Sequence, residues 1–101
     1  MLTWDEVLAR ARPCLRCRYV DRIAGPFSSE GRGRVKEAWG RGLVGETFIA
    51  IRSDTGCGQV EAKATYMHLV KRAGECHWCR RPLPMAELID CPVCKALNIM
   101  L

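Results

Sequence analysis

Cys76-His77-Trp78-Cys79 and Cys91-Pro92-Val93-Cys94 are the two stretches that decide the fold of the C-terminal quarter of this chain. We call them the first and the second knuckle. Each places two thiols on one tight turn, and the eleven residues from Arg80 to Asp90 separate them. Four thiolates on so short a segment form the ligand set of a closed tetrahedral zinc site. A segment of about 26 residues cannot fold on a core of its own, so the metal would stabilise it directly. We therefore predict a four-cysteine zinc ribbon over residues 76–101, with a closing strand between residues 95 and 101.

This segment resembles a known family of zinc proteins. The run Ile89-Asp90-Cys91-Pro92-Val93-Cys94-Lys95-Ala96-Leu97-Asn98, preceded by Cys76 and Cys79, is similar to the Com family, the small zinc-finger regulators of Mu-like phages. The resemblance covers about a quarter of the chain, and the spacer between the knuckles is shorter than the family's. It implies that the zinc ligands are Cys76, Cys79, Cys91 and Cys94, with Lys95 and Asn98 after the second knuckle. It also implies an mRNA-binding translational activator, as in the type member.

Three further cysteines precede the ribbon and bring the total to seven in 101 residues. Cys14 and Cys17 form another Cys-x-x-Cys pair, which predicts half of a second zinc site with Cys57 and His68 as candidates to complete it. In the alternatives, the pair joins one of the knuckles, or Cys57 is an idle buried thiol and His68 a polar residue of a helix face. We expect His77 to be a knuckle residue rather than a ligand. The chain would then hold one zinc ion, or two if the second site forms.

The length of 101 residues and the ordinary apolar fraction predict one compact domain, with a small α+β unit over residues 1–75 in front of the ribbon. No apolar run approaches the roughly 18–20 residues that cross a bilayer. The N-terminus is acidic and lacks the pattern of a secretory signal. We therefore expect a cytoplasmic protein that makes no membrane contact. In such a reducing compartment, cysteines bind metal rather than form disulfides.

Two helices are predicted outside the ribbon. The first runs from Thr3 to Arg12, because Thr3 and Glu6 fit a capping box and apolar residues recur at helical spacing, with Trp4 as a core anchor. The second runs from Val60 to Ala73 and buries Val60, Ala64 and Met67 on one side, with Gly74 placed to cap it.

The remaining segments predict strands and a loop. Leu43 to Ile51 contains the apolar run Phe48-Ile49-Ala50-Ile51, which indicates a buried strand, and a short strand is expected from Arg18 to Ala24. Gly25 to Arg34 is rich in glycine and serine and predicts a mobile loop, followed by a helical turn from Val35 to Trp39. The expected fold is therefore α+β, a small mixed domain with two helices and short strands that ends in the zinc ribbon.

Basic residues are concentrated in one part of the chain. Residues 10–41 contain nine basic and three acidic residues, and so carry +6, in a chain whose formal net charge is +5. This stripe predicts a surface for phosphate, or else a solvated basic face. Trp78 is expected either to stack on an unpaired base or to pack against the rest of the protein. The expected nucleic-acid-binding residues are Arg16, Arg18, Arg32, Arg34, Trp78, Arg80, Arg81 and Lys95.

Catalysis is not expected. Four cysteines close the coordination shell, whereas a catalytic zinc keeps an open position. The chain contains no deaminase, Walker A, Rossmann or nucleophile-elbow pattern. A redox role for the second knuckle would need a thioredoxin-like context, which the short, proline-broken spacer does not provide. We therefore expect neither enzymatic activity nor a small-molecule substrate.

Two functions remain. In the first, the protein is a small zinc-binding regulator of phage type that binds RNA or DNA to control expression. In the second, it is a protein-interaction module, for example an inhibitor of a host enzyme, and its zinc is purely structural. Arginines that gather beside the ribbon would favour the first function. Arginines that pair with Glu30, Glu37 and Glu61 would disfavour it.

Overall fold

In the computed structural model, which describes residues 2–17 and 22–101, the C-terminal segment folds around two antiparallel strands, β1 (Leu88–Asp90) and β2 (Leu97–Ile99). Leu88 pairs with Ile99, and Asp90 with Leu97. All of β2 is buried, because it lies between the first knuckle and the main core. The predicted closing strand is therefore confirmed, and the spacer between the knuckles supplies its partner.

The first helix, α1 (Trp4–Ala9), begins as predicted and ends early. Thr3 accepts a hydrogen bond from the Glu6 backbone N–H, and the Glu6 carboxylate accepts one from the Thr3 N–H, which confirms the capping box. The helix stops because Arg10 adopts an extended backbone, and its guanidinium donates to Asp90 and to the Pro13 carbonyl. Trp4 is buried as expected.

Residues 29–55 form a helical hairpin where a mobile loop and a buried strand were predicted, and both of these predictions are wrong. α2 (Ser29–Gly40) begins at Ser28, whose hydroxyl accepts from the Gly31 N–H. α3 (Val44–Thr55) contains the whole Phe48–Ile51 run, in which Ile51 is fully buried and Ile49 is 68% exposed. In a helix only part of a four-residue apolar run can face the core.

α4 (Gln59–Met67) confirms the second predicted helix but is shorter and buries a different face. Ala62, Ala64 and Thr65 are buried, whereas Val60 and Met67 are exposed, so the predicted buried side is wrong for these two residues. The helix ends at His68 because the following backbone pairs with β2. The Ile99 N–H donates to the His68 carbonyl, and the Val70 N–H donates to the Ile99 carbonyl. Gly74 lies beyond this pairing, in the turn that leads to the first knuckle, and does not cap the helix.

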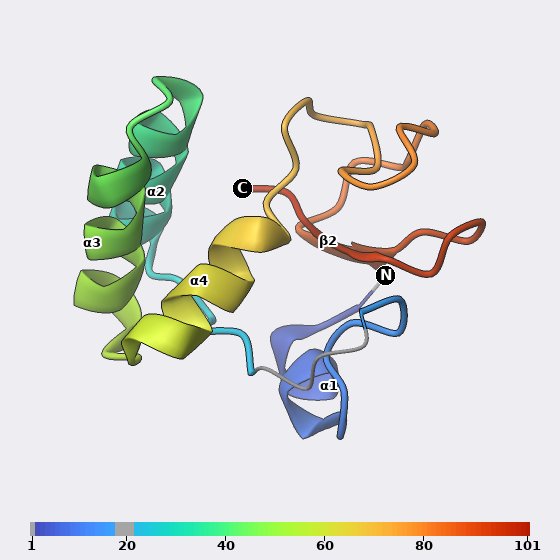
Figure 1. Cartoon of the computed structure of the whole chain (residues 1–101), viewed down its shortest axis with the longest axis horizontal. Coiled ribbons are helices and arrows are strands. Elements are labelled where there is room, and N and C mark those ends of the chain that lie inside the picture. The colour runs from blue at the N-terminus through green and yellow to red at the C-terminus, as the bar shows by residue number, and fades with distance from the viewer. Residues whose placement is uncertain (1, 18–21) are drawn as a thin grey trace.

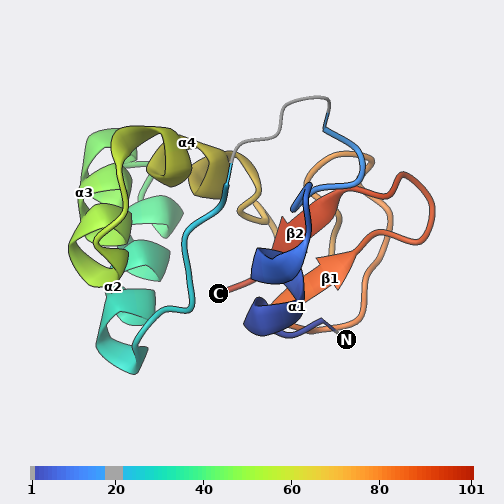
Figure 2. The same cartoon turned by 90° about the horizontal axis from the view of Figure 1, so that it is seen from below.

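Within the described residues the chain has four helices, not two, and the predicted α+β class is confirmed. Of the strand predicted from Arg18 to Ala24, residues 18–21 lie outside the described residues and residues 22–24 belong to no strand. Figure 1 shows α2 and α3 at one end of the molecule, the knuckles at the other, and α4 between them. Figure 2 shows α1 beside the two strands.

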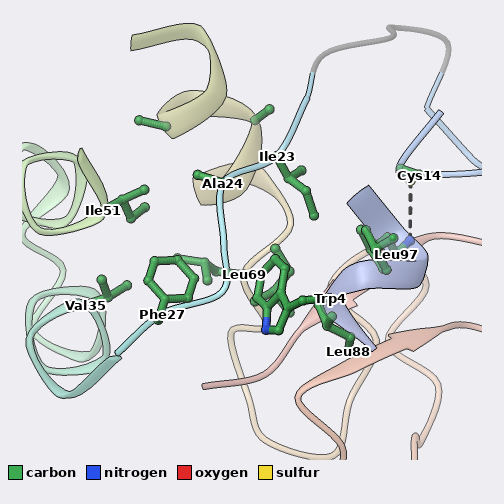
Figure 3. Packing of buried hydrophobic residues seen from close by; sticks show 14 residues of the cluster. Trp4, Cys14, Ile23, Ala24, Phe27, Val35, Ile51, Leu69, Leu88 and Leu97 are labelled. Atoms are coloured by element: carbon green, nitrogen blue, oxygen red, sulfur yellow. Dashed lines mark hydrogen bonds between the residues drawn. The ribbon is translucent and has the colours of Figure 1, made fainter. Parts of the chain in front are cut away.

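One hydrophobic core joins the two ends of the molecule. Trp4 packs edge-on against Phe27, with ring centres 5.7 Å apart, and its indole N–H donates to Glu87 at 2.9 Å. Figure 3 shows Trp4 between the helical end and the strands. The same cluster contains residues of α2, α3 and both strands, namely Val35, Ile51, Leu88, Leu97 and Ile99. The ribbon therefore shares its core with residues 1–75, and only a small second cluster lies around its cysteines.

Candidate metal centres

The four cysteines of the two knuckles converge at one point. Their sulfur atoms all lie within 4.8 Å of one another, with 3.6 Å between Cys76 and Cys94 and 3.6 Å between Cys79 and Cys91. These distances are far too long for a disulfide bond. Tetrahedral zinc with Zn–S bonds of about 2.3 Å would place its sulfurs about 3.8 Å apart, which is close to the observed spacing. Cys76 and Cys91 are buried and the other two are half-buried. This group can therefore hold a metal ion.

The two knuckles have the same backbone hydrogen bonds. In the first knuckle the Arg80 N–H donates to the Cys76 carbonyl at 3.0 Å, and in the second the Lys95 N–H donates to the Cys91 carbonyl at 2.9 Å. Arg80 and Lys95 both have a φ of +68°, the left-handed conformation that lets the chain turn back. Each knuckle therefore positions its two sulfurs by the same turn, which follows from the identical Cys-x-x-Cys spacing.

Neighbouring donors support the Cys76 sulfur. The Trp78 N–H lies 3.4 Å from it and the Asn98 side-chain amide 3.5 Å, while the Asn98 carbonyl oxygen accepts from the His77 N–H. Burial raises the pKa of Cys76, but hydrogen bonds from the backbone of Cys79 and Trp78 and from the Asn98 side chain outweigh it and lower the pKa to about 6. Burial, together with the adjacent thiols, raises the pKa of Cys94 to about 12. Asn98 is a fully buried supporting residue that the residue pattern alone did not single out.

A second group forms where the segment after α1 meets the end of α4. The side chains of Cys14, Cys17 and His68 offer three ligand atoms within 4.8 Å of one another. The predicted joining of the Cys14–Cys17 pair with His68 is thus found in the structure. Cys57 lies in the turn between α3 and α4, packed against the main core, and the structure does not bring it to this group.

His68 is oriented as metal-binding histidines usually are. Its Nδ1 lies 2.6 Å from the Ala64 carbonyl, so Nδ1 carries the proton and donates it. The other nitrogen, Nε2, is then the one that a metal would bind on releasing its proton, and it lies 3.3 Å from the Cys17 sulfur. His77 is different, because its Nε2 lies 2.8 Å from the Leu97 carbonyl, and it belongs to neither group.

Hydrogen bonds also reach the Cys14 sulfur and change its pKa. The Leu97 N–H donates to its sulfur at 3.3 Å, the dashed contact in Figure 3. Burial raises the pKa of Cys14, but hydrogen bonds from His68 and from the backbone of Leu97 and Cys17 lower it to about 6. Burial and the neighbouring Cys14 raise the pKa of Cys17 to about 11. Thiolate is the form that binds metal, so the lowered pKa of Cys14 favours its metal-binding form.

Four of the eight arginines of residues 10–41 form ion pairs with carboxylates in the part of the chain that the structure describes. Arg32 and Arg34 lie on α2 and pair with Glu87 and Glu30, each at 2.6 Å. Two further pairs join Arg10 to Asp90 and Arg41 to Glu37. Glu61 instead accepts from the Gly58 N–H. Two of the three pairings that would disfavour nucleic-acid binding by the arginine-rich stretch, those with Glu30 and Glu37, therefore occur. Glu87 and Asp90 are further partners that no sequence pattern indicated.

The other predicted basic residues lie on or beside the knuckles. The Arg16 guanidinium lies over the Trp78 ring, 5.2 Å from the ring centre. Trp78 is 55% exposed, so most of its ring faces solvent instead of packing inside. Arg80, Arg81 and Lys95 are exposed. Arg18 lies outside the described residues.

No protein-family model, no curated protein and no solved structure matches this chain. In the part of the chain that the structure describes, no helix has the length and apolar character to span a membrane.

Proposed function

We propose that the four-cysteine group binds zinc and that this zinc is structural. Four soft thiolates in a closed tetrahedral arrangement are typical of structural zinc, with no open position for a substrate. The buried cluster around the group is small, and consists of Cys76, Leu83, Cys91 and Ala96. Without a metal, little else would hold the knuckles together, so the zinc would stabilise this end of the fold.

We further propose that the first knuckle binds single-stranded nucleic acid. Trp78 carries this proposal, because an exposed indole on a metal-stiffened turn, with the Arg16 cation beside it, offers both stacking and charge. Such pairs of an aromatic ring and a basic group bind unpaired bases together with their phosphates. A buried tryptophan would have offered neither.

The charges around Trp78 suit a phosphate backbone. Lys71, Arg72 and Arg80 line a depression beside the first knuckle, together with one acidic residue, Glu75. The two arginines of α2 are not counted in this surface, because Arg32 is paired with Glu87 and Arg34 with Glu30. Most of α2 also lies away from the first knuckle (Figure 1). A role in controlling expression, as in the Com family, would follow from such binding and rests on the resemblance alone.

A titration of labelled single-stranded RNA, single-stranded DNA and duplex DNA at two salt concentrations tests this proposal. We expect single strands to bind best, with an affinity that falls as salt rises, because phosphate contacts release counterions. Trp78→Ala should weaken binding by about 5- to 150-fold, since stacking contributes about 1–3 kcal/mol per base. Arg80→Ala should weaken it as well, whereas Arg34→Ala removes the same charge at the other end and should have little effect.

The absence of binding at low salt would refute the nucleic-acid proposal, and so would equal losses in Arg80→Ala and Arg34→Ala. The first result would favour the alternative, a protein-interaction module with structural zinc, in which the exposed Trp78 contacts a protein partner.

A further inference from the structure

We propose that Cys14, Cys17 and His68 bind a second zinc ion, which holds the 14–17 turn against the first knuckle and thereby keeps Arg16 over Trp78. The metal site itself does not depend on nucleic-acid binding. Only its effect on the Arg16–Trp78 pair bears on the function proposed above.

The ligand atoms are of the right kind and are already close. Two thiols and one imidazole within 4.8 Å match a ligand set used by zinc in proteins. Cys14 is 4% exposed and His68 is 7% exposed, so both are held inside the fold. The group also draws on parts of the chain 51 residues apart, the separation between Cys17 and His68. A metal ion there would cross-link the segment after α1 to the end of α4.

The surroundings of the group resemble the outer shell of a metal site. The Ala64 carbonyl accepts the Nδ1 proton of His68, which leaves Nε2 free to bind a metal. The Leu97 N–H donates to the Cys14 sulfur, as backbone N–H groups do to metal-bound thiolates. Two of the three ligands, Cys14 and His68, are thus held by backbone partners.

The second site touches the first knuckle on two sides. Arg16 lies between the two ligand cysteines in sequence, and its guanidinium sits over the Trp78 ring. The ring of His68 meets the ring of His77 edge-on, with 5.5 Å between their centres. A metal that fixes Cys14, Cys17 and His68 would therefore also fix the cation that accompanies Trp78.

The site also has a route to solvent. A cavity of about 210 Å³ is lined by Cys17, His68, His77 and Trp78, among other residues. Within residues 2–17 and 22–101 three ligand atoms meet at this site, compared with four at the knuckles. We therefore expect the second zinc ion to exchange faster and to be removed first by a chelator.

Zinc content per folded chain tests the site directly. We expect two equivalents in the wild type and one in Cys17→Ser and His68→Gln. Cys57→Ser and His77→Gln are the matched controls, because Cys57 is the cysteine outside both groups and His77 is the other histidine. Both variants should keep two equivalents of zinc. One equivalent in the wild type would overturn the proposal, and so would an equal loss in Cys57→Ser.

A second measurement covers the case in which a variant folds poorly. In the wild type, a chelator titrated at limiting concentration should remove zinc in two phases. Hydrogen exchange followed by NMR should show that the Leu97 amide loses its protection during the first phase of zinc release. The Leu97 amide is informative because it donates to the Cys14 sulfur. Release in a single phase, or unchanged protection of Leu97 after the first zinc leaves, would contradict the proposal. Neither result depends on nucleic acid, so the site and the proposed function can fail separately.

Discussion

Gly25→Ala adds one methyl group at a place where the structure has no room for it. A Cβ at this position would lie 2.5 Å from Cη2 of Trp4 and closer still to Cζ3 and Cε3. Carbon atoms in contact are normally about 3.5–4.0 Å apart. The indole ring would have to move by about 1 Å, although it is 9% exposed, packed on Phe27 and hydrogen-bonded to Glu87.

The expected loss of stability is large for a single methyl group. Overpacking of a core costs about 1–3 kcal/mol, and loss of the Trp4–Glu87 hydrogen bond adds about 1 kcal/mol. Together these give about 2–4 kcal/mol, out of roughly 5–15 kcal/mol expected for a domain of this size. Since 1 kcal/mol shifts the midpoint by about 5 °C in a domain of about 100 residues, Tm should fall by about 10–20 °C.

Thermal unfolding followed by circular dichroism, with zinc in excess for every variant, measures this loss. Gly33→Ala is the matched control, because nothing lies within 4 Å of its Cβ, and it should be stabilising by about 0.5–1 kcal/mol as an alanine within a helix. Trp4→Phe removes the ring atoms that collide with the methyl group. If the collision is the cause, Gly25→Ala should cost much less in that background. An equal cost in both backgrounds would refute the reasoning.

Three further predictions concern the helical hairpin and the metal. In Gly31→Ala the added methyl group would overlap the Asp54 carboxylate. In urea unfolding this variant should be at least about 1 kcal/mol less stable than Gly33→Ala, and equal stability of the two variants would contradict this contact. Zinc affinity of the four-cysteine group should rise with pH in calorimetric titrations, because zinc must displace the proton of Cys94, whose pKa is raised to about 12. Cys76 contributes less to this dependence, because its pKa of about 6 leaves it mostly ionised at pH 7. Complete removal of zinc by a strong chelator should abolish the slow exchange of the Arg80 and Lys95 amides, which close the two knuckle turns. Persistence of that protection would show that the knuckles do not need their metal.

The features that the sequence predicted correctly are those with local causes. The capping box of α1 involves residues three apart, and each knuckle is a four-residue turn, so spacing alone determines both. β2 follows from a short apolar run after the second knuckle. The pairing of Cys14 and Cys17 with a distant histidine was predicted only as one of several options, because nothing in the sequence separates His68 from Cys57 as a partner.

The errors come from contacts between distant residues. Gly31 and Gly33 look like helix breakers, yet Gly31 is the position at which α2 passes Asp54 of α3 with no room for a side chain. The Phe48–Ile51 run is too short for its periodicity to distinguish a strand from a helix. Packing of Ile51 into the main core decides in favour of the helix. Ion pairs such as Arg32 with Glu87 join residues far apart in the chain and leave no local pattern.

The matched hydrogen bonds of the two knuckles make the ribbon a pseudo-symmetric unit with two equivalent faces. Trp78 and Val93 occupy the same position in their turns, two residues after the first cysteine, and they are 55% and 58% exposed. Neither side chain is needed to bind the metal. The exchange Trp78→Val with Val93→Trp would therefore move the aromatic surface to the opposite turn and leave all four thiolates in place. In this ribbon the scaffold and the recognition surface can thus change independently, so new specificities could be selected at either turn without loss of the metal.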